Sequence, residues 1–464
     1  MKLRHLISAF AFAVTVVTAA AQSPKYIFYY IGDGMGMGPV MAAETYNRTV
    51  LGNSDPLLMF RFPVVGLCAT YSASSDVTDS AAAGTALSTG YKTKNGMLGM
   101  GPDTTNVYSV ALDLQKLGYG IGIATSVAPD DATPGAFYAH VPNRAMSEQI
   151  DRQMAQCGYQ FVAGAQLRGT ADKDGKDNGV LDLFRQNKVQ IVRGPEGIKD
   201  IDSERVVLLS TEGIGDSGNI GYTIDSIPGA LNLPIIARTC LAQLEKTSPD
   251  KFFMMIEGGN IDHALHGNDG GSAIKEILNF NEALAVAFDF YEKHPDETLI
   301  VVTADHDTGG MSMIKPSKHG AGLSNIDFQR VSKEGFSKYC EGILRSRMVY
   351  KWQDMKEYLA DNLGFYTHIK ISDKQEALLE KQFNATFELR NSDDQKTLYA
   401  NFNRFAVEVF RIFNDATGLA FTTTSHSGNP VPVFAVGVGA EKFRHYNNNI
   451  NIAPAILDTV KNGK

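Results

Sequence analysis

Short apolar runs alternate with helical patterns along most of the chain. Six of these runs are rich in β-branched and aromatic residues, as buried strands are: 25–33, 119–126, 205–211, 251–259, 298–307 and 431–439. Helical periodicity occupies segments between them, for example 272–294. This alternation predicts an α/β fold with a large, mostly parallel central sheet that carries helices on both faces.

The pattern changes between residues 315 and 424. Strand-like runs disappear there, and amphipathic helices are predicted at 373–389 and 401–413. The second of these helices has an aromatic face made of Phe402, Phe405, Val409, Phe410 and Phe413. We therefore expect a core of residues 22–314 and 425–464 that is interrupted by a helical insertion at 315–424. The insertion could serve as a lid, a crown or a dimer element, or it could be a structural elaboration packed on the core.

The amino-terminal segment has the three parts of a secretory signal peptide. Lys2 and Arg4 precede an apolar run at 6–17, and small residues at 19–21 follow it. We predict a signal peptide at 1–21 and hence an exported protein, periplasmic or secreted. The apolar run is too short for a comfortable membrane span, and no later run reaches about 18 apolar residues, so no membrane association is expected.

The composition of the 464-residue chain narrows the functional classes. Hydrophobic residues make up 44% of it, which is enough for a large buried core, and the formal net charge is −8. That charge argues against a nucleic-acid partner, because affinity for nucleic acid comes mainly from lysine and arginine. The cysteines lack metal-site spacing, and they could form disulfides in three possible pairings or remain buried thiols: Cys68, Cys157, Cys240 and Cys340.

Acidic residues and histidines follow several of the predicted strands. Asp33 lies in "IGDGMGMGP", whose glycines permit close backbone approach but lack the G-x-G-x-x-G order of a dinucleotide site. The segment "EGGNIDHALHGND" supplies Glu257, and then Asp262 and His266 four residues apart on one helical face, a pair that suits zinc. Because sites in open α/β sheets form at the carboxyl ends of strands, we expect these side chains to converge.

A third cluster and a serine complete the candidate chemistry. "TADHDTGG" ends another strand with Asp305 and His306, and His426 precedes the last strand. "VTDSAAAGTALSTG" places Ser80 after Asp79 at a predicted helix start, where backbone N–H groups favour an oxyanion. Serine is a weak nucleophile without an activator, and the chain has no G-x-S-x-G motif. This inventory suits two close metal ions that activate the serine and neutralise a phosphoryl group.

Six motifs together resemble the alkaline phosphatase family, in the order in which that family carries them. They are "IGDGMG", "TDSAAAGTA", "DATPGAFYAHVPNR", "EGGNID..LH", "TADHDTGG" and "SHSG", and they extend over nearly all of the expected core. The resemblance implies a three-layer α/β sandwich and hydrolysis of small-molecule phosphate monoesters, with a homodimer as one possible assembly.

The resemblance also implies a role for each candidate residue. Ser80 would be the nucleophile and become phosphorylated during turnover. One zinc ion would be held by Asp262, His266 and His426, and a second by Asp33, Asp305 and His306. A magnesium ion would bind Asp33, Thr133 and Glu257. Arg144 would grip two phosphoryl oxygens, and Asp79 would orient Arg144. Asp131 and His263 would lie beside the third ion.

Two other classes of function remain as alternatives. The first is a phosphodiesterase or phosphonate hydrolase on the same metal core; a sulfatase would need a C/S-x-P-x-R motif, which the chain lacks. Thr133, Arg144 and Glu257 together favour a terminal phosphoryl group, which has three free oxygens. The second alternative is a phosphate- or metal-binding protein without catalysis, against which the intact Ser80 argues.

Overall fold

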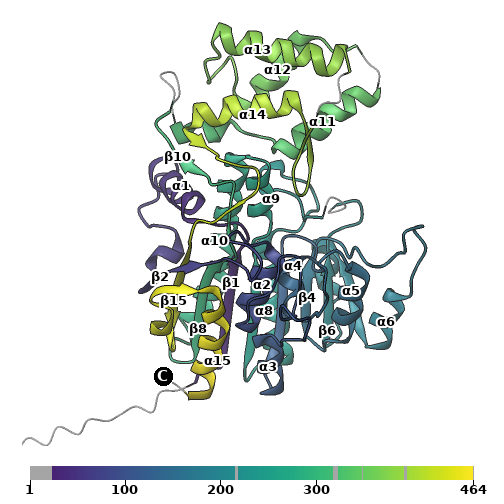
Figure 1. Ribbon diagram of the computed structural model, residues 1–464, viewed down its shortest axis with the longest axis vertical. Coiled ribbons are helices and arrows are strands. Elements are labelled where there is room, and N and C mark those ends of the chain that lie inside the picture. Colours follow the sequence, from purple (N-terminus) through teal and green to yellow (C-terminus); the bar gives the residue numbers. More distant parts are fainter. Residues whose placement is uncertain (1–22, 215–217, 317–321, 347–348, 391–393, 463–464) are drawn as a thin grey trace, which may run out of the picture.

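The computed structural model describes residues 23–214, 218–316, 322–346, 349–390 and 394–462 (Figure 1). The predicted signal peptide at 1–21 lies outside these ranges. Within them, none of the helices combines the length and the apolar character that crossing a membrane requires.

A ten-stranded sheet forms the centre of the molecule, in the order β16-β2-β15-β8-β1-β7-β3-β4-β6-β5. All neighbouring strands are parallel except β15, which is antiparallel to both β2 and β8. The strands are β1 (Tyr26–Gly32), β2 (Val64–Ala69), β3 (Gly120–Thr125), β4 (Phe161–Gly164), β5 (Val189–Arg193), β6 (Arg205–Leu209), β7 (Phe252–Glu257), β8 (Thr298–Ala304), β15 (Val431–Gly437) and β16 (His445–Asn448).

All six predicted strands are present, and the sheet adds β2, β4, β5 and β16. These four are harder to recognise from the sequence. β2 alternates buried and exposed positions, β4 has only four residues, β5 is largely half-buried, and β16 reads "HYNN". Parallel strands buried on both faces give the continuous apolar runs that sequence patterns detect best.

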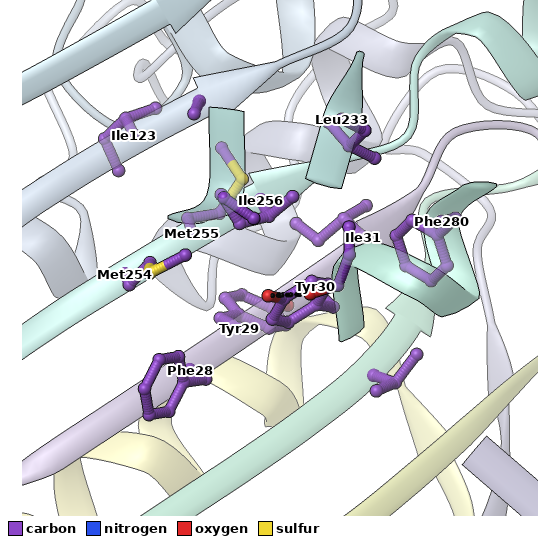
Figure 2. Close-up of a cluster of buried hydrophobic side chains, with 14 of the residues drawn as sticks. Phe28, Tyr29, Tyr30, Ile31, Ile123, Leu233, Met254, Met255, Ile256 and Phe280 are labelled. Atoms are coloured by element: carbon purple, nitrogen blue, oxygen red, sulfur yellow. Dashed lines mark hydrogen bonds between the residues drawn. The ribbon is translucent and has the colours of Figure 1, made fainter. Parts of the chain in front are cut away.

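Helices cover both faces of the sheet, which confirms the α/β sandwich. Neighbouring residues of a strand point to opposite faces, and β1 shows the two layers directly. The Tyr30 hydroxyl donates to the carbonyl of Ala283 in α10 (Gly270–Tyr291), at 2.8 Å. The Tyr29 hydroxyl donates to the carbonyl of Leu87 in α2 (Ser80–Thr89), at 3.4 Å. Figure 2 shows these tyrosines in the core, with Phe280 of α10 beside Tyr30.

Further helices complete each layer. On the α10 side lie α1 (Met37–Thr49) and α8 (Leu233–Thr247), and α9 (Asn260–His266) leads into α10. On the α2 side lie α3 (Val110–Lys116), α4 (Ala132–Gly135) and α15 (Ile452–Asn462). Helices α5 (Ser147–Gln156) and α6 (Val180–Gln186) pack against each other. The four cysteines are free thiols, so of the two possibilities that the sequence left open the structure has the unpaired one.

Between residues 315 and 424 the chain forms mainly helices. These are α11 (Lys333–Ser346), α12 (Trp352–Leu363), α13 (Asp373–Phe383) and α14 (Arg404–Thr417), with one π-helical turn at Asn384–Glu388. Figure 1 shows α11–α14 gathered at one end of the molecule. They enclose an apolar cluster of their own, which includes Phe336, Leu359 and Phe410 and is separate from the main core.

One helix prediction in this segment is wrong at its start. Residues 401–403, expected to begin the helix at 401–413, form strand β12 (Asn401–Asn403), which pairs with β11 (Asp394–Lys396). The Asn403 side chain accepts a hydrogen bond from the backbone N–H of Ala406, at 2.8 Å, and so caps α14, which begins at Arg404. Phe402 therefore leaves the aromatic face of the helix.

Lys333 attaches the start of α11 to the core at the end of α9. It is 2% exposed, and its Nζ donates to the carbonyl of Gly267, just after α9, at 2.7 Å. The ammonium group also lies over the Phe402 ring, 4.5 Å from its centroid. Burial lowers the pKa of Lys333 from 10.5 to about 8, and the Asp269 carboxylate only partly opposes that shift.

This lowered pKa predicts a specific pH dependence of stability. Between about pH 8 and 10.5 the unfolded chain holds the lysine proton more strongly than the folded one, so this group makes the free energy of unfolding rise with pH across that window. Lys333→Met should remove this contribution. Urea unfolding at several pH values checks it, with Lys370→Met at an exposed site as the control. An unchanged rise in the Lys333→Met variant would contradict the assignment.

Candidate active site

Parallel strand register brings the predicted acidic residues to one edge of the sheet. In β1, Ile31 pairs with Glu257 of β7 and Gly32 pairs with Ala304 of β8, so the three strands end together. Asp33 follows β1 directly, and Asp305 with His306 follows β8. These side chains therefore converge at the carboxyl ends of β1, β7 and β8, as the sequence predicts.

A glycine after Asp33 permits this convergence. Gly34 has a φ of +68°, and a Cβ atom built on it would lie 2.6 Å from Asp262 Oδ1. Its backbone N–H donates to Asp305 Oδ1 at 3.0 Å. Only glycine combines this backbone conformation with so close an approach, which explains the glycine-rich character of the loop.

Asp262, His266 and His426 form the first of two groups of metal-type ligands. Asp262 and His266 lie one helical turn apart on α9, with His266 Nε2 3.4 Å from Asp262 Oδ2. His426 belongs to β14 (His426–Ser427), which pairs with β9 (Asp307–Thr308) next to the end of β8. The three ligand atoms lie within 4.8 Å of one another.

In the tautomers of His266 and His426 that the structure indicates, the lone pairs on the two Nε2 atoms face each other. His266 Nδ1 donates to the Thr424 carbonyl at 2.6 Å, and His426 Nδ1 donates to the Thr78 carbonyl at 2.8 Å. Because a carbonyl only accepts, each neutral ring has its proton on Nδ1 and a lone pair on Nε2. The two Nε2 atoms are 3.1 Å apart. A cation between them would relieve the repulsion, so these residues fit a metal ion.

Asp33, Asp305 and His306 form the second group, and Ser80 lies against it. His306 Nε2 is 3.1 Å from Asp305 Oδ2, 3.4 Å from Asp33 Oδ1 and 3.1 Å from Ser80 Oγ. The Thr308 hydroxyl donates its proton to Asp262 Oδ1, so in the 3.2 Å contact between His306 Nδ1 and Thr308 Oγ1 the histidine nitrogen is the donor.

This geometry differs from a serine–histidine–aspartate relay. In a relay the acid binds the ring nitrogen opposite the serine, whereas here both carboxylates face the same nitrogen as Ser80. Asp33 Oδ1, Asp305 Oδ2 and Asp262 Oδ2 are buried and have no hydrogen-bond partner among the residues that the structure describes. Orphaned carboxylate oxygens beside an imidazole lone pair fit divalent cations.

The pKa shifts of Asp33 and His306 also show that this group of residues carries uncompensated negative charge. Burial raises the pKa of Asp33 well above its usual value, and the Asp305, Asp262 and Glu257 carboxylates raise it further. Burial alone would lower the pKa of His306, but the carboxylates of Asp305, Asp262 and Asp79 together raise that pKa. Bound cations would reverse the first effect and keep Asp33 ionised.

The residues expected at a third ion also lie together. Glu257 is 1% exposed and accepts a hydrogen bond from the Thr125 hydroxyl. Burial raises its pKa to about 8, while the hydrogen bond from the Thr125 hydroxyl acts in the opposite direction. Thr133 Oγ1 is buried and has no hydrogen-bond partner within the described ranges. Carboxylate and hydroxyl oxygens of this kind fit a hard cation such as magnesium.

Ser80 is the first residue of α2, and the Asp79 side chain caps that helix. The Asp79 carboxylate accepts the backbone N–H groups of Ala82 and Gly96, each at 2.9 Å. A Cβ on Gly84 would lie 3.1 Å from Thr133 Cα, so the small residues of α2 allow close packing on α4. The serine hydroxyl therefore sits at a helix N-terminus held against the metal-type ligands.

Asp131 is the nearer anchor of Arg144. Arg144 Nη2 donates to Asp131 Oδ1 at 2.9 Å, whereas Nη1 is 3.6 Å from Asp79 Oδ2. Arg168, which no sequence motif indicates, extends this chain of ion pairs. Its Nη1 donates to Asp131 Oδ2 at 3.4 Å and its Nε to Asp130 Oδ1 at 3.1 Å. A lone arginine in a loop carries no spacing signal, so only the fold reveals it.

Tyr399 is a second residue that the sequence did not predict. Its contact with His263 connects His263 to the site. Tyr399 lies between β11 and β12, and its ring stacks on that of His263, with centroids 3.7 Å apart. Burial raises the pKa of Tyr399 well above 10, and the Asp262 carboxylate adds to the shift. The phenol is therefore protonated and can donate a hydrogen bond.

Comparison with known proteins shows which family the chain resembles over most of its length. The chain matches the family model described as "Alkaline phosphatase" at residues 24–168 and 155–461. It is 27% identical over 449 residues to alkaline phosphatase 4 of Bacillus subtilis (strain 168), covering 95% of this chain and 89% of that one. It is 30% identical over 321 residues to the repressible alkaline phosphatase of Saccharomyces cerevisiae, covering 63% and 56% respectively.

Two solved structures share the fold. The cold-active alkaline phosphatase of a psychrophilic Shewanella sp. has a TM-score of 0.78 and 23% identity, covering 94% of this chain and 99% of that one. The alkaline phosphatase of Thermus thermophilus has a TM-score of 0.76 and 24% identity, covering 95% and 92%. The three-layer architecture is thus shared over almost the whole described chain.

The two groups of metal-type ligands predict that the protein binds at least two divalent ions. Native mass spectrometry of the protein equilibrated with zinc should detect at least two bound divalent ions. His426→Ala removes one of the two facing imidazoles and should lose the ion held by Asp262 and His266. His445→Asn, at an exposed histidine, is the matched control and should keep every ion. Equal ion counts in the His426→Ala variant and the unaltered protein would contradict this account.

Proposed function

Because the chain belongs to the alkaline phosphatase family, a family of phosphoric monoester hydrolases, we propose that Ser80 is the nucleophile of a two-step phosphomonoesterase reaction. One observation carries the proposal: the Ser80 hydroxyl is 3.1 Å from His306 Nε2, on the same side of the ring as Asp33 and Asp305. Two zinc ions held by the two ligand groups, and a magnesium ion at Asp33, Thr133 and Glu257, complete the proposed site.

The metal ions supply Lewis-acid chemistry: they lower the pKa of the nucleophile and neutralise charge on the phosphoryl oxygens. In the first step Ser80 gives up its proton to solvent, its Oγ bonds to phosphorus, and the bond from phosphorus to the leaving oxygen breaks, after which that oxygen takes up a proton from solvent. In the second step the oxygen of water bonds to phosphorus and the bond to Ser80 Oγ breaks. Inorganic phosphate leaves and the serine hydroxyl is restored, with net retention at phosphorus after two displacements.

Arg144 and the start of α2 position the phosphoryl group in this proposal. A guanidinium can hold two phosphoryl oxygens at once, which a single point charge cannot do. Asp131, with Asp79 farther away, fixes its orientation before substrate arrives. The N–H groups at the helix start favour the same negative charge. Recognition is concentrated on the phosphoryl group, so we expect a broad range of small-molecule monoesters.

We place this activity outside the cytoplasm. The support is the charged, apolar and small-residue order of the first 21 residues, which is typical of a cleaved export signal.

Replacement of the nucleophile tests the proposal. Ser80→Ala should reduce kcat for an aryl phosphate monoester by at least about a thousandfold, because no other described hydroxyl lies against His306 Nε2. Bound zinc, measured by native mass spectrometry, should be unchanged, since the serine is not among the proposed ligands. Ser75→Ala, at an exposed serine five positions earlier, should keep full activity. Near-normal turnover by Ser80→Ala would exclude the mechanism.

The choice of substrate separates this function from its main alternative. The unaltered enzyme should hydrolyse an aryl phosphate faster than the corresponding diester, because Arg144 and the metal sites engage the free oxygens of a terminal phosphoryl group. A faster diester reaction would favour a phosphodiesterase. Binding of phosphate without hydrolysis of either substrate would favour a non-catalytic binding protein.

A further inference from the structure

A β-hairpin from the 315–424 segment reaches the catalytic edge of the core. This 394–403 hairpin consists of β11, β12 and the turn between them, which is closed by a hydrogen bond from Thr397 N to Ala400 O at 2.9 Å. Phe402 anchors it, since a Cβ on Gly267 would lie 3.3 Å from the Phe402 ring. Gly267 directly follows α9, the helix that carries Asp262, His263 and His266. The hairpin is therefore held beside those ligands.

Tyr399 is the residue that the hairpin places over this helix. Its ring stacks on His263, with centroids 3.7 Å apart and planes 25° apart. The same ring meets His266 edge-on, with centroids 5.3 Å apart at 75°. Two contacts with one helical turn fix the ring in position, so the direction of its hydroxyl is determined as well.

The surroundings of the Tyr399 hydroxyl are those of the phosphoryl site. Besides burial, the pKa of this hydroxyl is raised by the carboxylates of Asp262, Asp131 and Asp33 and lowered by the Arg144 guanidinium. These are the groups assigned above to phosphoryl binding and metal binding. The Tyr399 side chain is half-buried, and its hydroxyl donates to no acceptor in the described part of the chain, so it is available to a bound ligand.

We propose that Tyr399 is a substrate-contacting residue whose hydroxyl donates a hydrogen bond to a free oxygen of the phosphoryl group, beside Arg144. This inference rests on the proposed function and extends it, since it gives the 315–424 segment a direct part in binding the phosphoryl group. The Tyr399 ring stacks on His263. Its hydroxyl is a neutral hydrogen-bond donor to the phosphoryl oxygens, and Arg144 is a charged one.

The decisive experiment measures phosphate binding without turnover. Isothermal titration of inorganic phosphate into the zinc-loaded Ser80→Ala protein gives the reference affinity. Adding Tyr399→Phe keeps the ring and removes only the hydroxyl, so it should weaken phosphate binding about tenfold, as the loss of a hydrogen bond to a charged group does. In the Ser80-containing enzyme the same change should raise KM for an aryl phosphate by a similar factor.

Two controls separate contact with substrate from a structural role. Tyr446→Phe, at a tyrosine that is 71% exposed, should leave phosphate affinity and KM unchanged. Metal content and Tm of Tyr399→Phe should match those of the parent, because stacking on His263 is retained. An unchanged phosphate affinity, or a weakened one accompanied by loss of bound metal, would overturn the proposal. Lack of hydrolysis by the unaltered enzyme would instead refute the proposed function, so the two failures are distinguishable.

Discussion

Crowded negative charge at one edge of the sheet is the constraint on which this structure depends. Asp33, Glu257, Asp262 and Asp305 are each 5% exposed or less, and they come from the ends of three adjacent strands and one helix. Burying carboxylates is costly unless positive charge or hydrogen bonds compensate them. Divalent cations would compensate both the facing histidine lone pairs and the buried carboxylate oxygens. Ser80 gains its proposed reactivity from the same compensation.

The sequence predicts those parts of this site that local pattern encodes. Asp33 follows one apolar strand, and Asp305 and His306 follow another. Because parallel strands end at a common edge, the sequence predicts that these metal-type ligands lie close together. Asp262 and His266 are recognisable by their helical spacing. His426 has no such local signal, because β14 brings it to the site from more than a hundred residues beyond His306. Only the order of whole motifs indicates its role.

Long-range packing accounts for what the sequence could not predict. Arg168, Asp131 and Arg144 form a continuous ion-pair chain although no spacing relates them. The hairpin that carries Tyr399 lies within a segment whose regular phenylalanines favour helix, and Asn403 ends the strand by capping the helix that follows. Its position depends on Phe402 packing against Gly267, a contact between residues far apart in sequence. Such contacts are set by tertiary structure, which outweighs local propensity.

The most direct test of the central claim is anomalous X-ray diffraction from crystals of the zinc-loaded protein, recorded above and below the zinc absorption edge. The account predicts two strong peaks of anomalous density. One lies among Asp262, His266 and His426, and the other lies among Asp33, Asp305 and His306, within reach of Ser80 Oγ. Density at neither group, or zinc bound only elsewhere on the chain, would contradict it.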